Sequence, residues 1–421
     1  MTDIRAPERL SNTALRQMIS LVPKVTGGLA LARRRVLWRN LLARFPAEPV
    51  LAGEYVLALL RSESWDDLAA FEPEARRHGQ NTIDLFYVDA ALARGDSAGA
   101  AERLAAVERR DGTSRETLWR RHDQYFMQHD FDRAIETAEQ LAGQTPADRR
   151  RAGRLARKAA FYRDLHSKWA AAVPRERDYD IYVVNLDSDT LRMERMNRQL
   201  DGVPFTRVPG VRGAYLPDMV LEAVTHGIGA AAKGTVGCFL SHLGTWERVV
   251  RAGRPALVLE DDAWVLAGLP SRLADVHLPK DFDYVSAAET FLPHEFDYRR
   301  KSFGVARPRD VLPGKPSNWE TPSTVAYFIS PAGARKLLAR VERDGAAGDV
   351  DWRILAYSLS SRERQAELKR DTAASRLLGH HHRLVAPGRR PINAYVLVPG
   401  LTRYFVAGSV RLHDNIGGVA G

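Results

Sequence analysis

Hydrophobic positions in the first 175 residues recur with the spacing of helices. A helical run followed by a stop that contains glycine occurs in three segments: 64–81, 96–114 and 130–146. The equivalent positions Trp65, Ser97 and Phe131 are 32 and then 34 residues apart, and helix-turn-helix repeats of the tetratricopeptide kind have a period near 34 residues. The spacing therefore predicts a small α-solenoid over roughly 36–170, with an irregular helical bundle as the alternative.

From Tyr179 onwards the pattern changes to short apolar runs that alternate with helical ones. Strands are predicted at 179–187, 205–208, 257–260, 283–288 and 321–330, and helices at 191–200, 237–250 and from Pro331. Strands that alternate with helices indicate an α/β sheet. We therefore expect three parts: an N-terminal extension (1–35), an all-α helical-repeat domain (36–175) and an α/β domain (176–421).

The predicted strand at 257–260 leads into three adjacent carboxylates, in the sequence LVLEDDAW. Burial of uncompensated charges is costly, and in open α/β sheets ligands bind beyond the carboxyl ends of the strands. A divalent cation would make the cluster favourable, because carboxylate oxygens suit Mg²⁺ or Mn²⁺ together with substrate phosphates. Alternation along a strand points Glu260 and Asp262 to the same side. Taken alone, the triplet is equally well explained by a solvated loop.

Composition narrows the class of protein. Hydrophobic residues make up 45% and charged residues 27% of the chain, which is ordinary for a globular protein. No apolar stretch is long enough to span a membrane, and the segment 19–32 lacks the features of a signal peptide. Cys238 is the single cysteine, which excludes an internal disulfide and fits a reducing compartment. We therefore expect a cytoplasmic protein.

Net charge adds an expectation about partners. The formal charge is +10, which favours nucleotide phosphates, acidic lipids or acidic glycans, unless the excess only solvates helix faces. The basic segment 149–158 is compatible with peripheral contact with the anionic inner face of a membrane. Zinc-finger spacing, a basic region leading into heptads and an aromatic RNA-binding signature are all missing from the sequence, so no nucleic acid partner is expected.

Four stretches, taken in order, resemble a known family. They are the opening strand with Asn185, Leu186, Asp187 and Arg192; GTVGCFLSHLGTW with Gly237, Cys238, Ser241 and His242; LVLEDD with Glu260, Asp261 and Asp262; and TVAYFISPAGARKLL (324–338), followed by Asp351. Over roughly 179–357 the chain resembles glycosyltransferase family 25, the lipopolysaccharide-type β-galactosyltransferases and their collagen-modifying relatives. Two positions depart from the family pattern, which has an acidic residue at Thr235 and Asp-Gly at Arg212-Gly213.

The resemblance implies a GT-A-like (Rossmann-type) fold and inverting transfer of a sugar, galactose in the first instance, from a UDP-sugar. The acceptor would be lipopolysaccharide, another surface polysaccharide or a lipid-linked glycan. Mn²⁺ (or Mg²⁺) would be held by Asp262 and Glu260. Donor binding would involve Asn185, Asp187, Arg192, Ser241, Glu260 and Asp261. Candidates for the general base that deprotonates the acceptor are Asp351, Glu289 and His242, of which Asp351 is preferred.

Some residues also have a simpler structural interpretation. On a helical wheel His242 lies at the margin of the apolar stripe, and we expect it to line a pocket with Ser241. Cys238 is expected to be a packing residue, since no base accompanies it as a nucleophile would require. The consecutive residues His380, His381 and His382 do not share one face of a helix or strand, so a loop is expected there.

Two alternatives of other classes stay open. The departures at Thr235 and Arg212 fit a non-catalytic helical-repeat adaptor that carries a degenerate transferase domain. The acidic cluster would also serve a metal-dependent hydrolase or phosphotransferase. For the glycosyltransferase, the repeats are expected to bind a protein partner or the acceptor, because solenoids present extended surfaces.

Overall fold

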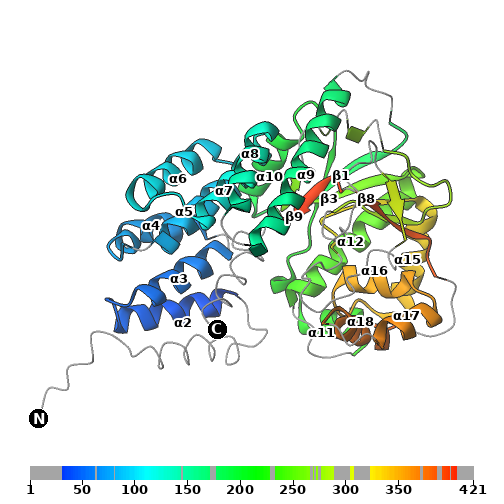
Figure 1. Cartoon of the computed structure of the whole chain (residues 1–421). Helices are drawn as coiled ribbons and strands as arrows, with labels where there is room; N and C mark the ends of the chain where they lie inside the picture. The colour runs from blue at the N-terminus through cyan, green and yellow to red at the C-terminus, as the bar shows by residue number, and fades with distance from the viewer. Residues whose placement is uncertain are drawn as a thin grey trace, which may run out of the picture. The chain divides into compact units, whose positions relative to one another are not determined.

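The computed structural model (Figure 1) describes residues 31–61, 64–79, 81–143, 146–170, 177–227, 233–265, 269, 272–273, 276–288, 304–307, 323–369, 373–385, 391–398 and 400–404. The chain divides into two compact units. One comprises Met1–Ala160 with Val406–Gly421, and the other comprises Phe161–Phe405.

The first unit is all-α, as the sequence predicted. Its described helices, the last of which continues into the second unit, are α2 (Leu31–Arg44), α3 (Pro49–Arg61), α4 (Trp65–Arg76), α5 (Asn81–Ala93), α6 (Ser97–Asp111), α7 (Arg115–Met127), α8 (Phe131–Ala142) and α9 (Pro146–Ala170). Helices α2 to α8 pack mainly on helices that are adjacent or next-but-one in the chain. Such near-neighbour packing is consistent with helical repeats.

Two equivalent turns support the repeat interpretation. Gly95 and His129 both have positive φ, 75° and 66°, and each precedes an aspartate, Asp96 or Asp130, that caps the next helix through its side chain. The backbone N–H of each aspartate also donates to the carbonyl five residues earlier, at 2.8 and 2.9 Å. Helices α5 and α7 therefore end, and α6 and α8 begin, in the same way one period apart.

The second unit contains a mixed α/β sheet of seven strands, in the order β2-β1-β3-β7-β5-β8-β6. The strands are β1 (Asp180–Asn185), β2 (Thr206–Pro209), β3 (Ala256–Glu260), β5 (Tyr284–Ser286), β6 (Gly304–Ala306), β7 (Ala326–Ile329) and β8 (Ala394–Val398). Strand β1 is parallel to β2 and β3, and β5 is parallel to β8. Strand β7 runs antiparallel to both of its neighbours, and β6 runs antiparallel to β8.

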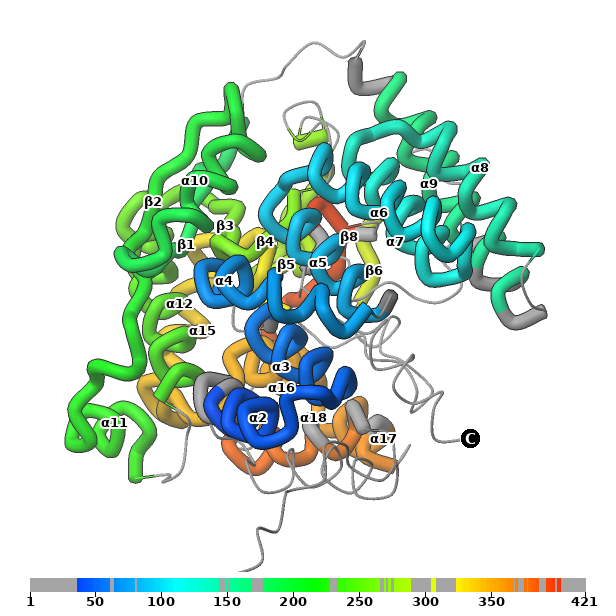
Figure 2. Tube along the Cα trace, turned by 90° about the vertical axis from the view of Figure 1, so that its left-hand side faces the viewer, coloured from blue at the N-terminus to red at the C-terminus, as the bar shows by residue number. Residues whose placement is uncertain are grey.

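Helices pack against this sheet and bury one continuous core. The described helices and 3-10 turn after β1 are α10 (Thr190–Gln199), η1 (Gly213–Tyr215), α11 (Asp218–Val224), α12 (Lys233–Ala252), α15 (Pro331–Asp344), α16 (Val350–Ser358), α17 (Ser361–Leu368) and α18 (Ala373–Arg383). Helices α12 and α15 lie side by side (Figure 2). Alternate residues of β1, β3 and β7, such as Val184, Val258 and Tyr327, form one cluster with apolar residues of these helices. This is expected for one face of a sheet.

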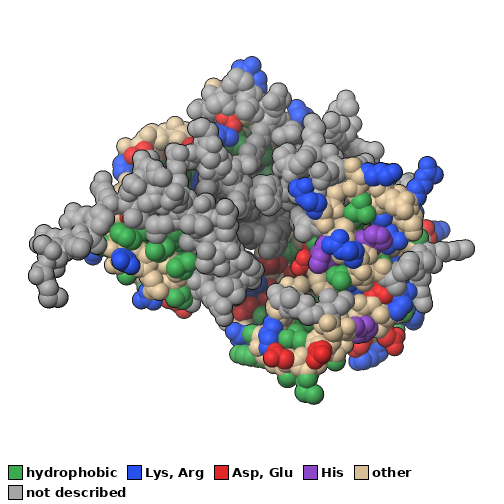
Figure 3. Space-filling view, turned by 90° about the horizontal axis from the view of Figure 1, so that it is seen from below, with side chains coloured by type: hydrophobic (Ala, Val, Ile, Leu, Met, Phe, Trp, Pro, Cys, Tyr) green, Lys and Arg blue, Asp and Glu red, His purple; other side chains and the backbone are tan. Residues whose placement is uncertain are grey.

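The second unit also holds elements that the sequence did not suggest. Strands β4 (Ala263–Val265) and β9 (Thr402–Tyr404) form a separate two-stranded sheet. The expected loop at His380–His382 was wrong, because these residues form the last turn of α18. Histidine side chains lie beside Lys and Arg side chains on the face shown in Figure 3. Among the described helices, none is both long and apolar enough to cross a membrane.

Candidate active site

The end of β3 sends consecutive side chains to opposite faces of the sheet. Glu260, in register with Val184, lies on the face that α12 covers. Asp261 lies on the other face with Asn185, which ends β1. The strand end therefore presents a different chemical environment to each carboxylate.

Asp261 connects three elements. Asn185 Nδ2 donates to its Oδ2 at 2.8 Å and Arg192 Nη1 donates to its Oδ1 at 3.0 Å. Its backbone carbonyl accepts from Arg195 Nη2 at 2.9 Å. Burial raises the pKa of this carboxyl, although Arg192 and Asn185 act to lower it. Asp261, which the sequence suggested as a donor ligand, thus bonds internally to β1 and α10.

Asp187 lies two residues beyond β1 and faces solvent. Its side chain is 79% exposed, and it pairs with Arg207 of β2, which also donates from Nε to Asn185 Oδ1 at 2.8 Å. Of the polar residues expected after β1, Asp187 is therefore the one that is open to a ligand.

Glu260 contacts His242, which belongs to α12. His242 Nε2 lies 3.2 Å from its Oε1, and His242 Nδ1 lies 2.9 Å from the hydroxyl of Tyr327 on β7. Although burial acts to raise it, the pKa of Glu260 is lowered by hydrogen bonds from His242 and Thr324 and by the charge of Arg192. Glu260 is therefore ionised at neutral pH.

His242 is not at a solvent margin, because its side chain is fully buried. Ser241 is buried as well, and its hydroxyl accepts from the N–H of Val211 at 2.8 Å and donates to the carbonyl of Gly237 at 2.7 Å. Ser241 therefore connects the segment between β2 and η1 to α12 through hydrogen bonds. The sequence did not predict this contact.

The same contact explains why glycine occupies position 237. A Cβ at Gly237 would lie 2.5 Å from the backbone nitrogen of Gly213, so backbone would have to move. We expect Gly237→Ala to lower the free energy of unfolding by about 1–3 kcal/mol through overpacking. Urea denaturation measures this change.

Gly244 of the same helix is the matched control. A Cβ there meets nothing within 4 Å, so Gly244→Ala should be neutral or stabilise by up to about 1 kcal/mol through helix propensity. Equal destabilisation by the two substitutions would contradict the close contact between α12 and η1.

Asp351, in the first turn of α16, belongs to a group of clustered carboxylates. Burial raises its pKa to about 8, and the charges of Asp349 and Glu260 add to the effect. Burial and the charges of Glu260, Asp351, Asp262 and Asp349 likewise raise the pKa of the Cys238 thiol. Within the described part of the chain, ligand atoms of Cys238, His242 and Glu260 lie within 4.8 Å of one another. The carboxylate oxygens of Glu260 and Asp262 are the ligands that would suit Mg²⁺ or Mn²⁺.

The remaining catalytic candidate of the sequence, Glu289, lies outside the described residues. Residues that the sequence did not single out include Tyr327, Trp246 and Thr324. The sequence feature that could have identified Tyr327 is its position within the apolar run TVAYFIS, since a buried hydroxyl needs a hydrogen-bond partner.

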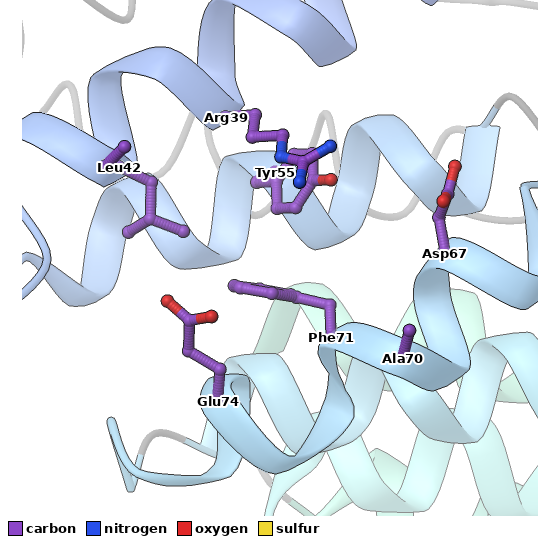
Figure 4. Close-up of a pocket in the computed structure, with 8 residues that line it drawn as sticks. Arg39, Leu42, Tyr55, Asp67, Ala70, Phe71 and Glu74 are labelled. Atoms are coloured by element: carbon purple, nitrogen blue, oxygen red, sulfur yellow. The ribbon is translucent and has the colours of Figure 1, made fainter.

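A separate pocket of about 270 Å³ lies in the helical unit. Tyr55 and Phe71 pack edge to face at 4.8 Å, and Arg39, Asp67 and Glu74 also line the pocket (Figure 4). This pocket, formed by α2, α3 and α4, combines aromatic and charged side chains as a site for a polar partner would.

Comparison with known proteins finds a family match within the second unit. The model of glycosyltransferase family 25 (LPS biosynthesis protein) matches residues 178–350. This part of the chain is therefore similar to glycosyltransferase family 25. The matched range includes β1, β3, α12 and the clustered carboxylates up to Asp349, and ends just before Asp351.

Curated relatives match parts of this chain. Probable inactive glycosyltransferase 25 family member 3 of Bos taurus is 36% identical over 115 residues, which cover 25% of this chain and 18% of that protein. Procollagen galactosyltransferase 1 of Danio rerio is 28% identical over 197 residues, covering 41% and 31%. Procollagen galactosyltransferase 2 of Homo sapiens is 28% identical over 193 residues, covering 41% and 30%. The chain thus spans less than a third of the length of these relatives.

The two departures from the family pattern lie on segments that touch. Thr235 is in the first turn of α12, and Arg212 directly precedes η1, where its guanidinium stacks 4.8 Å from the Tyr215 ring. Gly213 leaves no room for a Cβ against the Lys233 carbonyl. The two departures therefore lie on segments that pack against each other.

Proposed function

We propose that the chain is a metal-dependent glycosyltransferase that moves a sugar from a UDP-sugar to a glycan acceptor. Galactose is the proposed sugar, because relatives of the domain are named procollagen galactosyltransferases. The family description, LPS biosynthesis, supports a lipopolysaccharide or other surface glycan as the acceptor. A GT-A-like fold and inversion at the sugar carbon are parts of the same proposal.

One observation carries the proposal: Glu260 ends β3 and Asp262 follows it, inside the range that the family 25 model matches. Ligands of open α/β sheets bind beyond the carboxyl ends of strands, and carboxylates there favour a divalent cation. Glu260 and Asp262 would hold the cation, which would neutralise charge on the leaving diphosphate.

The chain's own residues divide the remaining tasks. Asp187 is exposed and suits a hydroxyl of the nucleotide ribose, while Asn185 and Arg192 support the site through Asp261. In the reaction, the bond from the sugar carbon to the diphosphate oxygen breaks and a bond to the acceptor oxygen forms. Asp351 would take the acceptor proton, and UDP would leave.

Calorimetry of UDP-galactose with and without Mn²⁺ tests the proposal on the full chain. We expect binding that requires the metal, and we expect Asp262→Asn to lose the metal-dependent part. Asp218→Asn is a suitable control, because Asp218 is exposed on α11 and pairs with Lys233. Absence of binding by UDP-galactose and by a panel of other UDP-sugars would reject the proposal.

A non-catalytic adaptor is the second candidate. Two relatives of the domain, from Bos taurus and Homo sapiens, are named inactive or probable inactive family members, and the chain departs from the family pattern at Thr235 and Arg212. On this alternative the pocket formed by α2, α3 and α4 binds a protein partner. Tight partner binding without metal-dependent turnover of any UDP-sugar would favour it.

A further inference from the structure

The cluster beneath Glu260 has the composition of a site for a thiophilic cation. Cys238 and His242 are four residues apart on α12 and therefore share one face of the helix. One ligand atom each from Cys238, His242 and Glu260 lie within 4.8 Å of one another, and Cys, His and Glu are all ligands of Zn²⁺. Whether His242 could serve as a ligand depends on which ring nitrogen carries the proton.

A buried chain of hydrogen bonds determines which ring nitrogen of His242 carries the proton. The indole N–H of Trp246 can only donate, and it donates to the hydroxyl oxygen of Tyr327 at 3.0 Å. Burial holds the pKa of Tyr327 well above its ordinary value of 10, so the hydroxyl keeps its own proton. Within the described part of the chain, the acceptor offered to that proton is Nδ1 of His242 at 2.9 Å.

The neutral ring of His242 must then carry its proton on Nε2, which faces Glu260 Oε1 at 3.2 Å. Trp246, Tyr327 and His242 have essentially no exposed surface, so water cannot replace any of these partners. For Nε2 to bind a metal, it would have to lose this proton. Nδ1 would then have to gain one, and the Tyr327 hydroxyl would lose its acceptor.

We propose that Trp246 and Tyr327 lock His242 in the Nε2–H form. The lock makes His242 a positioning residue that donates to Glu260, and it denies a thiophilic cation such as Zn²⁺ its nitrogen ligand. Of the three residues whose ligand atoms lie together, Cys238 and Glu260 then remain, and Glu260 stays available for an oxygen-bound cation. These hydrogen bonds form without any ligand, so the state of His242 does not depend on the proposed transfer reaction.

A cobalt titration of the full chain tests the lock, because Co²⁺ bound to a thiolate gives a charge-transfer absorption. We expect Tyr327→Phe to gain this band, with an affinity about tenfold or more above that of the native protein, since groups behind a metal-binding histidine typically change affinity by this much. Cys238→Ser in the Tyr327→Phe background should abolish the band.

Tyr284→Phe is the matched control. Tyr284 is buried and stacks on Tyr327 at 5.0 Å, but it does not belong to the hydrogen-bond chain, so this variant should behave like the native protein. The proposal is overturned if the native protein binds Co²⁺ through the thiolate as tightly as Tyr327→Phe does, or if Tyr284→Phe gains the band equally.

A measurement on the native protein covers the case in which Tyr327→Phe fails to fold. With ¹⁵N-labelled histidine, the His242 signals are those lost in His242→Gln. Long-range ¹⁵N–¹H correlations should show a proton on Nε2 and none on Nδ1. A protonated Nδ1 would overturn the lock directly.

Discussion

Asp351→Asn is expected to stabilise the protein at neutral pH while reducing transfer activity by about 10²–10⁴-fold, the range for loss of a general base. Burial and the charges of Asp349 and Glu260 raise the pKa of Asp351 from its ordinary value of 3.8 to about 8. Charging this carboxylate in the folded state therefore costs free energy, which an uncharged amide does not incur. We expect a gain of about 1–3 kcal/mol at pH 7.

The raised pKa of Asp351 determines how the free energy of unfolding changes with pH. The folded state binds more protons than the unfolded state between pH 3.8 and about 8, so the stability of the native protein falls as pH rises through this window. The advantage of Asp351→Asn should be absent below about pH 4. It should grow up to about pH 8 and then level off.

Urea denaturation at several pH values, with a chelator present so that no cation compensates the charge, measures the effect. Asp218→Asn is the control, because Asp218 is exposed and its pair with Lys233 lowers the pKa of its carboxyl, so this variant should leave the profile between pH 4 and pH 8 unchanged. A stability gain for Asp351→Asn that is the same at pH 3 and pH 8 would show that charge is not its cause.

Arg353→Met is expected to destabilise the protein by about 3–5 kcal/mol, because each buried acceptor left unsatisfied costs about 1–3 kcal/mol. Arg353 has no exposed surface. Its guanidinium donates to the carbonyls of Gly345 at 2.9 Å, Asp344 at 3.3 Å and Ala347 at 3.3 Å. Methionine fills similar space but leaves these carbonyls unsatisfied. The segment that leads to Asp351 would lose its support.

Arg362→Met on α17 is the matched control, since Arg362 is exposed and should change stability by less than about 0.5 kcal/mol. Arg353→Lys should recover only part of the loss, because an ammonium group cannot reproduce the fork of guanidinium donors. Equal stability of Arg353→Met and Arg362→Met in denaturant titrations would contradict the role of the buried guanidinium.

The local parts of the fold could be predicted from the sequence, and the long-range parts could not. The apolar runs that became β1, β3 and β7 and the cap at Ser330 are local signals. The insertion of β7 between β3 and β5 depends on pairing between segments far apart in the chain, which no local pattern contains. The helical turn at His380–His382 was missed because packing, not side-chain periodicity, determines where α18 ends.

The candidate site shows the same division. The strand ends after Asn185 and Glu260 were identified because carboxylates follow apolar runs. The wheel placed His242 at a margin, since its partners Tyr327 and Glu260 lie 85 and 18 residues away in sequence. The hydrogen bond by which Ser241 connects α12 to the segment after β2 depends on Val211, 30 residues earlier. Polar residues with distant partners are thus hard to place without the structure.

The reversed strand β7 also bears on how the protein is synthesised. Strand β3 ends at Glu260 and its partner β7 begins at Ala326, so a ribosome that adds about 5–20 residues per second needs roughly 3–13 s to reach it. Until then the nascent chain presents β3, a strand of almost wholly buried residues, as an unpaired edge. Such edges promote association between chains. Slower translation or limiting chaperones should therefore reduce the yield of folded protein before any effect on its finished stability is felt.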